Sequence, residues 1–571
     1  MTMVDASDIL SLCKRRGYLW PAYEIYGGVA GMYDYGPLGV GLKNNIIEIW
    51  RNAYTLGEGF IEIDGPTIGP EMVFKASGHV DEFSDVIVSC RECQESFRAD
   101  HLLTDHHPNP DSLSKEEMLS LMEEHDLKCP ECGGELTPPE EFNLMFNTTI
   151  GSGSGRVGYL RPETAQGIFV NYIPFYRHMR EKLPFGVIQI GRGYRNEISP
   201  RQGMIRLREF NMMEAELFVN PDDKNWDAFK DVKDEMLKLV PQDGDEVEMS
   251  LEDAVENGII AHQTIAYFMW FTSEFLKAVG VDNERMRFRQ HLSTEMAHYA
   301  CDCWDAEALL SYGWTELVGI ADRGSWDLSR HIEYSKAEMT AFLRYDEPRE
   351  MERDVIKPNY GLLGPEFKAK AAKIGKALEK MNPSQIDDSV SVEVDGERIA
   401  VDRRFFEIAK VKEKISGEKV IPHVIEPSHG LDRILYTVME HSFTKKDGNY
   451  VILKLSPDVA PIKVGVFPLM SRDGLEEKAV EIDEDLRVSG ITTHFDDSGS
   501  IGRRYARMDE IGTPWCVTVD YESLEDGTVT IRDRDTAEQV RVHADDVPIV
   551  VGSLLCGMEF DDIEEMLESD V

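Results

Sequence analysis

Residues 191–210 read GRGYRNEISPRQGMIRLREF, and this stretch concentrates positive charge in a strongly acidic chain. It holds five arginines and two glutamates, whereas the whole chain has 61 Lys and Arg residues, 105 Asp and Glu residues and a net charge of −44. The residues before Arg195 alternate as a strand, SPRQG is a turn sequence, and the residues from Met204 return as a second alternating run. The stretch therefore predicts a β-hairpin that carries arginines at its end and in its loop.

The side chains of this hairpin suit a nucleotide. Arginine binds phosphate oxygens through two parallel N–H donors and keeps its charge, and an aromatic ring such as Phe210 stacks on a base. The alternative is an arginine-rich surface hairpin that pairs with the acidic body of the protein. The residues alone leave both interpretations open.

Length and composition limit the class of protein. A chain of 571 residues, 42% of them hydrophobic, predicts two to four domains. No run of about 18 apolar residues occurs, so we expect no membrane partner. The N-terminus places an apolar run before its basic residues, the reverse of a signal peptide, so none is expected. Nine cysteines with two CxxC pairs favour a reducing compartment, and we expect a cytoplasmic protein.

The acidic residues are spread through segments that also hold periodic apolar residues, which predicts a solvated acidic surface suited to strong salt. At ~1 M salt the Debye length falls to about 3 Å, so the repulsion between these charges is screened. The same screening weakens contacts to a polyanion. A nucleic-acid partner would therefore be held by short-range contacts.

The chain holds two CxxC pairs, Cys90 with Cys93 and Cys129 with Cys132, and 35 residues lie between them. Two such turns can complete a closed shell of four sulfurs, which is typical of structural zinc. A redox role is the alternative for either pair alone. Ser114 and Glu117 form a capping-box pattern that predicts a helix between the pairs. Four nearby histidines are alternative ligands or surface residues: His101, His106, His107 and His125.

Other segments can be assigned from their patterns. Residues 43–64 predict a helix that leads into a strand, and residues 222–290 predict mainly helix. Asp395-Gly396 between alternating runs predicts a hairpin within 335–415. Beyond Pro461, strands and helices alternate as in a separate α/β domain. The GSGSG run at 151–155 lacks the Gly-Lys-Ser/Thr ending of a phosphate-binding loop and predicts a flexible loop.

Three of these segments resemble the motifs of class II aminoacyl-tRNA synthetases. The arginine hairpin resembles motif 2, GFIEIDGP ending at Pro66 resembles motif 1, and HGLDRILYTVME with Gly430 and Arg433 resembles motif 3. Within the class, YEIYGGVAGMYDYGPLGVGLKNNI, SFRADHL, RPETAQGIFVNY, ELVGIADR and EPSHGLDR are similar to the homodimeric archaeal and eukaryotic glycyl-tRNA synthetase family. This resemblance covers nearly the whole chain, because the residues from about 460 onward resemble the anticodon-binding domain of such enzymes.

The resemblance implies an α+β fold: a catalytic core built on a six-stranded antiparallel sheet, a zinc-ribbon-like insertion and a C-terminal α/β anticodon-binding domain. The implied divisions are 1–84 (core with motif 1), 85–142 (cysteine insertion), 143–334 (core with motif 2), 335–415 (second insertion), 416–456 (core with motif 3) and 457–571 (anticodon-binding domain).

The resemblance also implies a two-step reaction in a homodimer. Glycine would react with ATP, accompanied by Mg²⁺, to give glycyl-adenylate and pyrophosphate. The glycyl group would then pass to tRNA(Gly). Arg195, Glu197 and Arg433 would be catalytic, and Glu316 would bind ATP with the metal ion, with Arg323 close behind it. The full ATP set would be Arg195, Asn196, Glu197, Ile205, Arg206, Leu207, Arg208, Glu209, Phe210, Glu316, Leu317, Gly430, Leu431, Asp432 and Arg433.

In this family carboxylates surround the ammonium group of glycine, and they correspond here to Glu163, Glu214 and Glu426. Ser428 would lie beside the α-carbon, where a methyl group would clash. A tight pocket excludes larger amino acids sterically, so no editing domain is expected. The implied glycine set is Arg98, Glu163, Phe210, Asn211, Met212, Met213, Glu214, Glu426, Pro427, Ser428, His429 and Gly430.

Two other functions stay open on sequence grounds: a class II synthetase for another small amino acid, and a non-catalytic, nucleic-acid-binding relative. EPSHG together with Glu163 and Glu214 disfavours the first, and the retained Arg195, Arg206 and Arg433 disfavour the second. In the last domain, Arg503, Arg504 and Arg507 fall on one predicted helix. They would meet the anticodon stem or form a surface charge pattern.

Overall fold

The computed structural model describes residues 5–107, 109–153, 155–200, 203–242, 244–292, 301–381, 389–446 and 450–569. Arg201 and part of the GSGSG run lie outside these residues. The chain forms two compact units, one of Met1–Met339 with Ile421–Val571 and one of Thr340–Val420. Among the described residues, no helix combines the length and apolar character that crossing a membrane requires.

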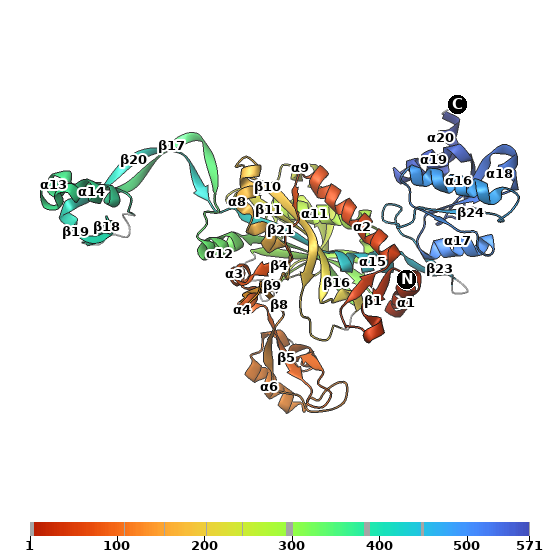
Figure 1. Ribbon diagram of the computed structural model, residues 1–571, viewed down its shortest axis with the longest axis horizontal. Coiled ribbons are helices and arrows are strands. Elements are labelled where there is room, and N and C mark those ends of the chain that lie inside the picture. The colour runs from red at the N-terminus through yellow and green to blue at the C-terminus, as the bar shows by residue number, and fades with distance from the viewer. Residues whose placement is uncertain are drawn as a thin grey trace. The chain divides into compact units, whose positions relative to one another are not determined.

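A nine-stranded sheet forms the centre of the larger unit (Figure 1). Six neighbouring strands, in the order β14–β15–β16–β21–β11–β10, pair antiparallel, and this confirms the sheet that the family resemblance implies. Three more strands extend the sheet, because β3 pairs parallel with β10, β12 pairs parallel with β14, and β13 follows β12 at the edge. The strands are β3 Ile61–Ile63, β10 Phe185–Tyr194, β11 Glu209–Val219, β12 Met236–Val240, β13 Val247–Ser250, β14 Met286–Gln290, β15 Asp302–Leu310, β16 Gly313–Gly324 and β21 His423–Gly430.

The prediction of a mainly helical segment at 222–290 is wrong in part. α9 (Phe229–Val232), α10 (Leu251–Glu256) and α11 (Gln263–Ala278) are helices, but the segment also contributes the strands β12, β13 and β14. β12 alternates between buried and less buried residues, as a strand with one face toward a core does. A run this short is ambiguous in sequence, and pairing with neighbouring strands decides its structure.

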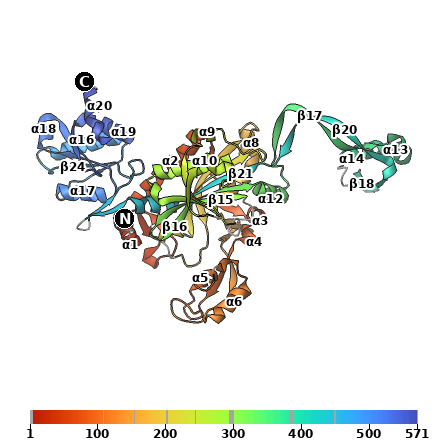
Figure 2. The same ribbon diagram turned by 180° about the vertical axis from the view of Figure 1, so that it is seen from behind.

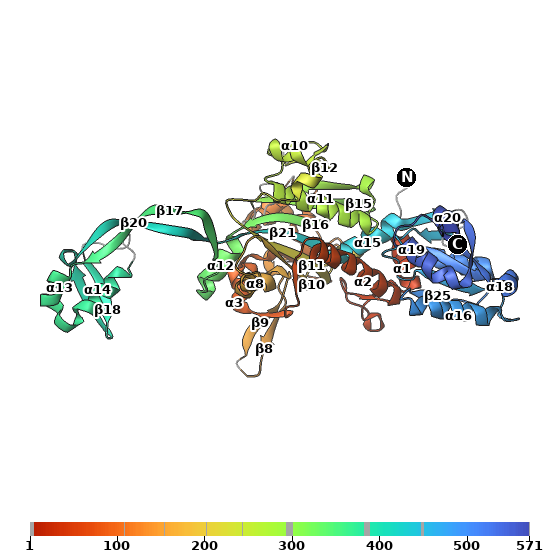
Figure 3. The same ribbon diagram turned by 90° about the horizontal axis from the view of Figure 1, so that it is seen from above.

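One face of the central sheet packs on an apolar core formed with α2 (Pro37–Asn52), α11 and α15 (Leu431–Ser442), which Figure 3 shows beside the sheet. On α2, Leu42, Ile46 and Trp50 recur every four residues, so they share one side of the helix, and all three are buried. Tyr54 continues this line into the next turn, where its ring packs at a tilt against Trp50 with centroids 4.6 Å apart. Because this face is apolar, the polar side chains of the central strands are left for the opposite face.

The cysteine insertion has a small core of its own, built from Val88, Ala99, Leu103, Met118 and Met122. Its strands are β5 (Ser84–Ser89), β6 (Ser96–Arg98) and β7 (Glu140–Asn143), and its longest helix is α6 (Lys115–Glu124). The predicted capping box is present at the start of α6, where Ser114 and Glu117 bond reciprocally.

The C-terminal part is an α/β layer structure, as predicted (Figure 2). Strands β25 (Thr493–Phe495), β24 (Val464–Pro468) and β26 (Trp515–Val519) are parallel, and β27 (Thr528–Asp533) and β28 (Gln539–His543) continue the sheet antiparallel. α16 (Leu475–Val488) and α19 (Val547–Leu555) share one apolar core with the sheet, and α17 (Ile501–Glu510) packs in a second cluster with Phe467 and Cys516.

The smaller unit, Thr340–Val420, consists of a long antiparallel pair, β17 (Ala341–Pro358) with β20 (Phe406–Val420), and a compact end with its own core. The predicted hairpin is present there as β18 (Ser389–Val394) and β19 (Glu397–Asp402). Asp395 and Gly396 have φ values of 56° and 80°, which is the left-handed pair that a two-residue hairpin turn requires.

The three arginines of α17 do not form one surface. Arg504 is buried, with only 2% of its surface exposed, and its guanidinium donates to the carbonyl oxygens of Pro468, Asp497 and Gly499. Arg507 pairs with Asp496, and Arg503 is exposed. Both interpretations of the cluster are therefore wrong for Arg504, which holds two loops together because carbonyl oxygens converge on it.

We expect Arg504→Met to lower the free energy of unfolding by about 2–4 kcal/mol, because buried carbonyl oxygens lose their donor. Arg503→Met, one residue away on the exposed side of the same helix, is the matched control and should change stability by less than about 0.5 kcal/mol. Urea denaturation of the full chain measures both. Equal effects of the two substitutions would contradict the structural role of Arg504.

Candidate active site

The arginine-rich stretch is the predicted hairpin of β10 and β11, with Tyr194 opposite Glu209 at its end. The pairing continues one step further, since the backbone N–H of Arg195 donates to the carbonyl of Arg208 at 3.0 Å. The loop between the strands includes a short helical turn, Gly203–Ile205. The turn brings Arg206 back toward the end of the hairpin, beside Glu197.

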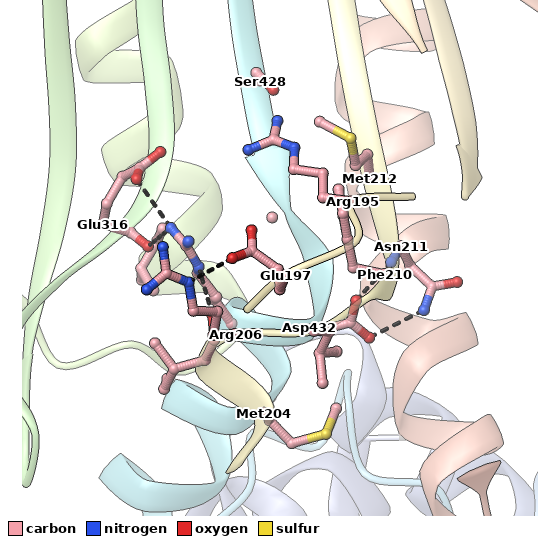
Figure 4. A pocket seen from close by; sticks show the side chains of 15 residues that line it. Arg195, Glu197, Met204, Arg206, Phe210, Asn211, Met212, Glu316, Ser428 and Asp432 are labelled. Carbon is pink, nitrogen blue, oxygen red and sulfur yellow. Dashed lines mark hydrogen bonds and ion pairs between the residues drawn. The ribbon is translucent and has the colours of Figure 1, made fainter. Parts of the chain in front are cut away.

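A cavity of about 290 Å³ opens at the end of this hairpin (Figure 4). Its walls come from the hairpin, its loop, β16, β21 and the start of α15. The lining residues are Arg195, Glu197, Met204, Ile205, Arg206, Leu207, Phe210, Asn211, Met212, Glu316, Leu317, Ser428, Gly430, Asp432 and Arg433. Sequence reasoning missed Met204 in this set, although an apolar residue directly after a polar turn was a usable signal.

The cavity pairs each of its cationic groups with an acid or a ring. The guanidinium of Arg195 lies 5.2 Å from the centre of the Phe210 ring. Arg206 Nε donates to Glu197 at 2.7 Å, and Arg433 donates to the Glu316 carboxylate at 2.9 Å. The charge of Arg433 lowers the pKa of Glu316 below its usual range. Three forked cations and one aromatic ring around a cavity suit a phosphate chain joined to a base.

Strand alternation decides which predicted residues face this site. On β21, Glu426 and Ser428 point to the polar face, whereas the ring of His429 packs between Trp50 and Phe275 in the core, 5.6 and 5.5 Å away. Burial lowers the pKa of His429 to about 3. The side chain of His429 therefore lies in the core, which leaves only its backbone for the predicted glycine contact, and that contact stays a prediction. Alternation or packing also turns the side chains of Met213, Pro427 and Leu431 inward, and their predicted roles, glycine binding for the first two and ATP binding for Leu431, stay predictions.

Four further predicted residues lie around the hairpin, outside the cavity lining. Arg98 forms two hydrogen bonds with Asp100, and Arg208 donates to the carbonyls of Glu197 and Ala30. The carboxylate of Glu209 pairs with Arg192, and the backbone of Asn196 bonds to that of Leu144. Of these contacts, Arg208 with Ala30 and Asn196 with Leu144 join the hairpin to other segments of the chain.

The three predicted glutamates form a buried acidic cluster behind Ser428. Ser428 Oγ donates to Glu214 at 2.9 Å, in register with the pairing of these two residues across β21 and β11. The other oxygen of Glu214 accepts the backbone N–H groups of Thr164 and Ala165 at 2.6 and 2.8 Å. Glu163 and Glu426 lie on either side, and Glu163, Glu214 and Glu426 are 8%, 1% and 6% exposed.

Arg323 is the cation of this cluster. Its guanidinium bonds to Glu426, forms two hydrogen bonds with Asp327 at 2.7 and 3.0 Å, and lies 3.8 Å from Glu163. One guanidinium thus stands among several carboxylates. A ligand with a positive charge would restore the balance that burial of these groups disturbs.

The ionisation of the cluster follows from this crowding. Burial raises the pKa of Glu426 to about 8, and burial together with the charge of Glu163 raises that of Glu214. Burial acts to raise the pKa of Glu163 too, but His79 and Arg323 outweigh it and hold the value well below its usual range. Sequence reasoning missed Glu216, a fully buried carboxyl group beside Glu426 that has no hydrogen-bond partner among the described residues. The alternation from Glu214 to Glu216 was its signal.

The four cysteines of the insertion converge as the sequence predicted. Cys90 Sγ lies 3.4 Å from Cys132 Sγ, and Cys93 Sγ lies 3.6 Å from Cys129 Sγ. These distances match the edges of a sulfur tetrahedron around one ion at about 2.3 Å. The backbone N–H of Cys93 points at Cys90 Sγ and lowers the pKa of that thiol to about 6. Of the alternative ligands, His106 and His125 stack on each other, and none of the four histidines joins this group.

Two family models match the chain. The model described as "tRNA synthetase class II core domain (G, H, P, S and T)" matches residues 153–442, and the "Anticodon binding domain" matches residues 463–554. The core match spans β10, β11, β16 and β21, the strands that build the cavity.

Relatives match along almost the whole chain. It is 52% identical to the glycine–tRNA ligase of Methanothrix thermoacetophila and 53% identical to that of Archaeoglobus fulgidus, in each case over 96% of this chain and 97% of the relative. It is 50% identical to the corresponding ligase of Methanocaldococcus jannaschii over 94% and 97%. The fold is similar to a solved prolyl-tRNA synthetase of Giardia lamblia, with a TM-score of 0.53 and 14% identity over 95% and 76% of the two chains.

The raised pKa of Glu426 predicts a specific pH dependence of stability. A carboxyl group whose folded pKa is about 8 stabilises the folded state fully below its unfolded pKa of about 4.3, and this contribution is lost as the pH rises through about 8. We expect Glu426→Gln, which cannot ionise, to gain stability relative to the wild type between about pH 5 and about pH 8. Urea denaturation at several pH values, without ligand, measures this difference. Parallel pH profiles of the two proteins would contradict it.

Proposed function

The chain belongs to the glycine–tRNA ligases of the class II synthetase family, and from this premise we propose which of its residues carry out the reaction. The enzyme activates glycine with ATP and transfers it to tRNA. The observation that carries the assignment of residues is that the arginine-lined cavity and the buried acidic cluster meet at Ser428, which lines the first and bonds to the second.

ATP occupies the cavity at the end of the hairpin in this proposal. Phe210 stacks on the adenine, and Arg433 covers the base or holds the outer phosphates together with Arg206. Arg195 holds the α-phosphate and the carboxylate of glycine, with Glu197 near the adenine. The position of the Arg195 guanidinium, 5.2 Å from the Phe210 ring and in the same cavity as Ser428, supports this division.

Magnesium accompanies ATP in class II synthetases, and the site has a fitting ligand. Glu316 lines the cavity, and its lowered pKa keeps the carboxylate ionised, as an oxygen ligand for Mg²⁺ must be. The ion would neutralise phosphate charge beside Arg433. The protein side chains assigned to ATP act by binding and by charge, and none of them gives or takes a proton in this proposal.

The first step joins a glycine carboxylate oxygen to the α-phosphorus and breaks the bond to pyrophosphate, which leaves. Such a step needs alignment and neutralisation of negative charge more than acid–base catalysis. In the second step the 3′ hydroxyl of the terminal adenosine attacks the glycyl carbonyl. Its proton passes to a phosphate oxygen of the adenylate, and AMP leaves with the electron pair of the cleaved bond. Arginine suits both steps because it stays charged and binds two oxygens at once.

Glycine is selected by charge and by space in this proposal. Glu163, Glu214 and Glu426 receive its ammonium group, which supplies the positive charge that the buried cluster lacks. Ser428 stands beside the α-carbon, so the methyl group of alanine meets the pocket wall. One methyl group is worth only ~1–3 kcal/mol in a forgiving pocket, so rigid walls are required. The relatives named for glycine favour this amino acid over another small one, and the three arginines in the cavity disfavour a non-catalytic relative.

tRNA(Gly) is the proposed nucleic-acid partner, held at its anticodon by residues 463–554. We also propose that the protein is a homodimer. Ile25, Tyr26 and Leu56 are 89%, 85% and 81% exposed, and apolar side chains so accessible to water favour a protein partner. A reducing, cytoplasmic location is proposed because all nine cysteines are free. The acidic surface favours activity in strong salt.

A structural zinc ion is proposed for Cys90, Cys93, Cys129 and Cys132, which supply four soft donors and leave no open position for catalysis. Such an ion would join the end of β5, directly before Cys90, to the loop after α6, since the insertion has only a small apolar core.

Glycine-dependent ATP–pyrophosphate exchange in molar potassium chloride tests the function. We expect exchange with glycine and not with alanine or serine, and a loss of about 100-fold or more in Arg195→Ala, because a donor to the reacting phosphate is removed. Arg177→Ala, an exposed arginine of α8 (Tyr172–His178), is the matched control and should keep wild-type exchange. Exchange with another amino acid, or full activity in Arg195→Ala, would contradict the assignment.

Metal analysis of the purified protein tests the zinc site. We expect one zinc ion per chain in the wild type and its loss in Cys90→Ser or Cys132→Ser, because a structural site needs all four ligands. Cys556→Ser removes an exposed thiol outside the cluster and should leave the zinc content unchanged. Zinc retained by both cluster variants would exclude the site.

A further inference from the structure

A buried amide lies directly behind the acidic cluster. Gln166 belongs to α7 (Ala165–Phe169) and is 2% exposed. Its Nε2 donates to Glu163 at 2.9 Å and to Asp327 at 3.1 Å, and its Oε1 lies 2.8 Å from the Nε2 of His331. Both ends of the amide therefore have partners, and none of the roles assigned above uses this residue.

His331 fixes the direction of that amide. Because the nitrogen of Gln166 faces two carboxylates, its oxygen must be the end that accepts from the imidazole. Burial lowers the pKa of His331, so the ring is neutral and carries its proton on Nε2. A flipped amide would set its oxygen against the carboxylates of Glu163 and Asp327 and its N–H groups against the imidazole N–H. The observed orientation gives Glu163, Asp327, His331 and the Gln166 amide itself hydrogen-bond partners of the right kind.

Asp327 links this amide to the cation of the cluster. Asp327 and His331 are four residues apart on α12 (Trp326–Ser335), so they lie on one side of the helix. Asp327 accepts two hydrogen bonds from Arg323, whose third contact is Glu426. One buried network thus supports Glu163 through Gln166 and Glu426 through Arg323.

We propose that Gln166 and His331 are positioning residues that set the geometry of the glycine pocket. An amide suits this task because it holds Glu163 in place by a hydrogen bond without cancelling its charge, which then remains available to an ammonium group. A lysine or arginine in its place would neutralise the carboxylate. This inference rests on the proposed role of Glu163 and Glu426 in binding the ammonium group of glycine.

The kinetic test separates glycine binding from the other steps. In ATP–pyrophosphate exchange, Gln166→Met and His331→Leu should raise the KM for glycine about tenfold or more, the effect of losing a hydrogen bond to a charged group. The KM for ATP and the kcat at saturating glycine should stay within about twofold, since the arginine cavity is untouched. His331→Gln places an amide N–H near the position of the imidazole N–H and should restore most of the glycine affinity.

A separate control measurement tests whether each variant is folded. Thermal unfolding of each variant shows whether it is folded, and Gln166→Ala, which removes the amide without adding a charge, replaces Gln166→Met if that protein does not fold. An equal rise in the KM for glycine and the KM for ATP, or no recovery in His331→Gln, would overturn the proposal, because general loosening of the fold would then explain the effect.

Glu163→Gln distinguishes this inference from the proposed function on which it rests. If Glu163→Gln raises the KM for glycine and Gln166→Met does not, the positioning role is wrong and the glycine site stands. If neither does, the carboxylate pocket itself is wrong. In the double variant, Gln166→Met should add less than about threefold to the effect of Glu163→Gln, because both act through one carboxylate, and fully additive effects would overturn the proposal.

Discussion

The buried acidic cluster depends on the guanidinium of Arg323, which is 3% exposed and contacts Glu426, Asp327 and Glu163. Carboxylates cannot be buried together as ions without a cation and hydrogen-bond donors to compensate the lost hydration. Arg323 compensates only part of this cost, and the raised pKa values of Glu214 and Glu426 express the remainder. The cluster therefore favours a cation beside it, because added positive charge offsets this cost.

The central sheet allows this site because its two faces meet different environments: a polar cavity on one side and an apolar core on the other. Along β21, Ser428 faces the cavity and His429 packs against Trp50 in the core. The apolar packing of α2 and α11 supports the strands from one side, so the carboxylates on the other side stand on a rigid base. Precise placement of charged groups requires such support, because a displaced carboxylate would lose its neighbours and its selectivity.

Several features followed from sequence alone because they rest on local chemistry. The hairpin at 191–210, the Asp395-Gly396 turn, the capping box of α6 and the convergence of Cys90, Cys93, Cys129 and Cys132 each depend on a few residues close in the chain. Residues that fell elsewhere than predicted depend on packing. β12, which pairs with both β13 and β14, was taken as part of a mainly helical segment, and Arg504 was taken as an exposed residue.

The sequence by itself determined which groups are available: an arginine-rich hairpin, glutamates at motif positions of the family it resembles, and two pairs of cysteines. Only the tertiary structure decided which of these groups meet. Glu163, Glu214, Arg323 and Glu426 are separated by up to 263 residues and come from a loop and three strands. Strand pairing brings Ser428 opposite Glu214, and helix packing brings Gln166 and His331 behind them, because burial of apolar surface elsewhere in the core sets the positions of those strands and helices.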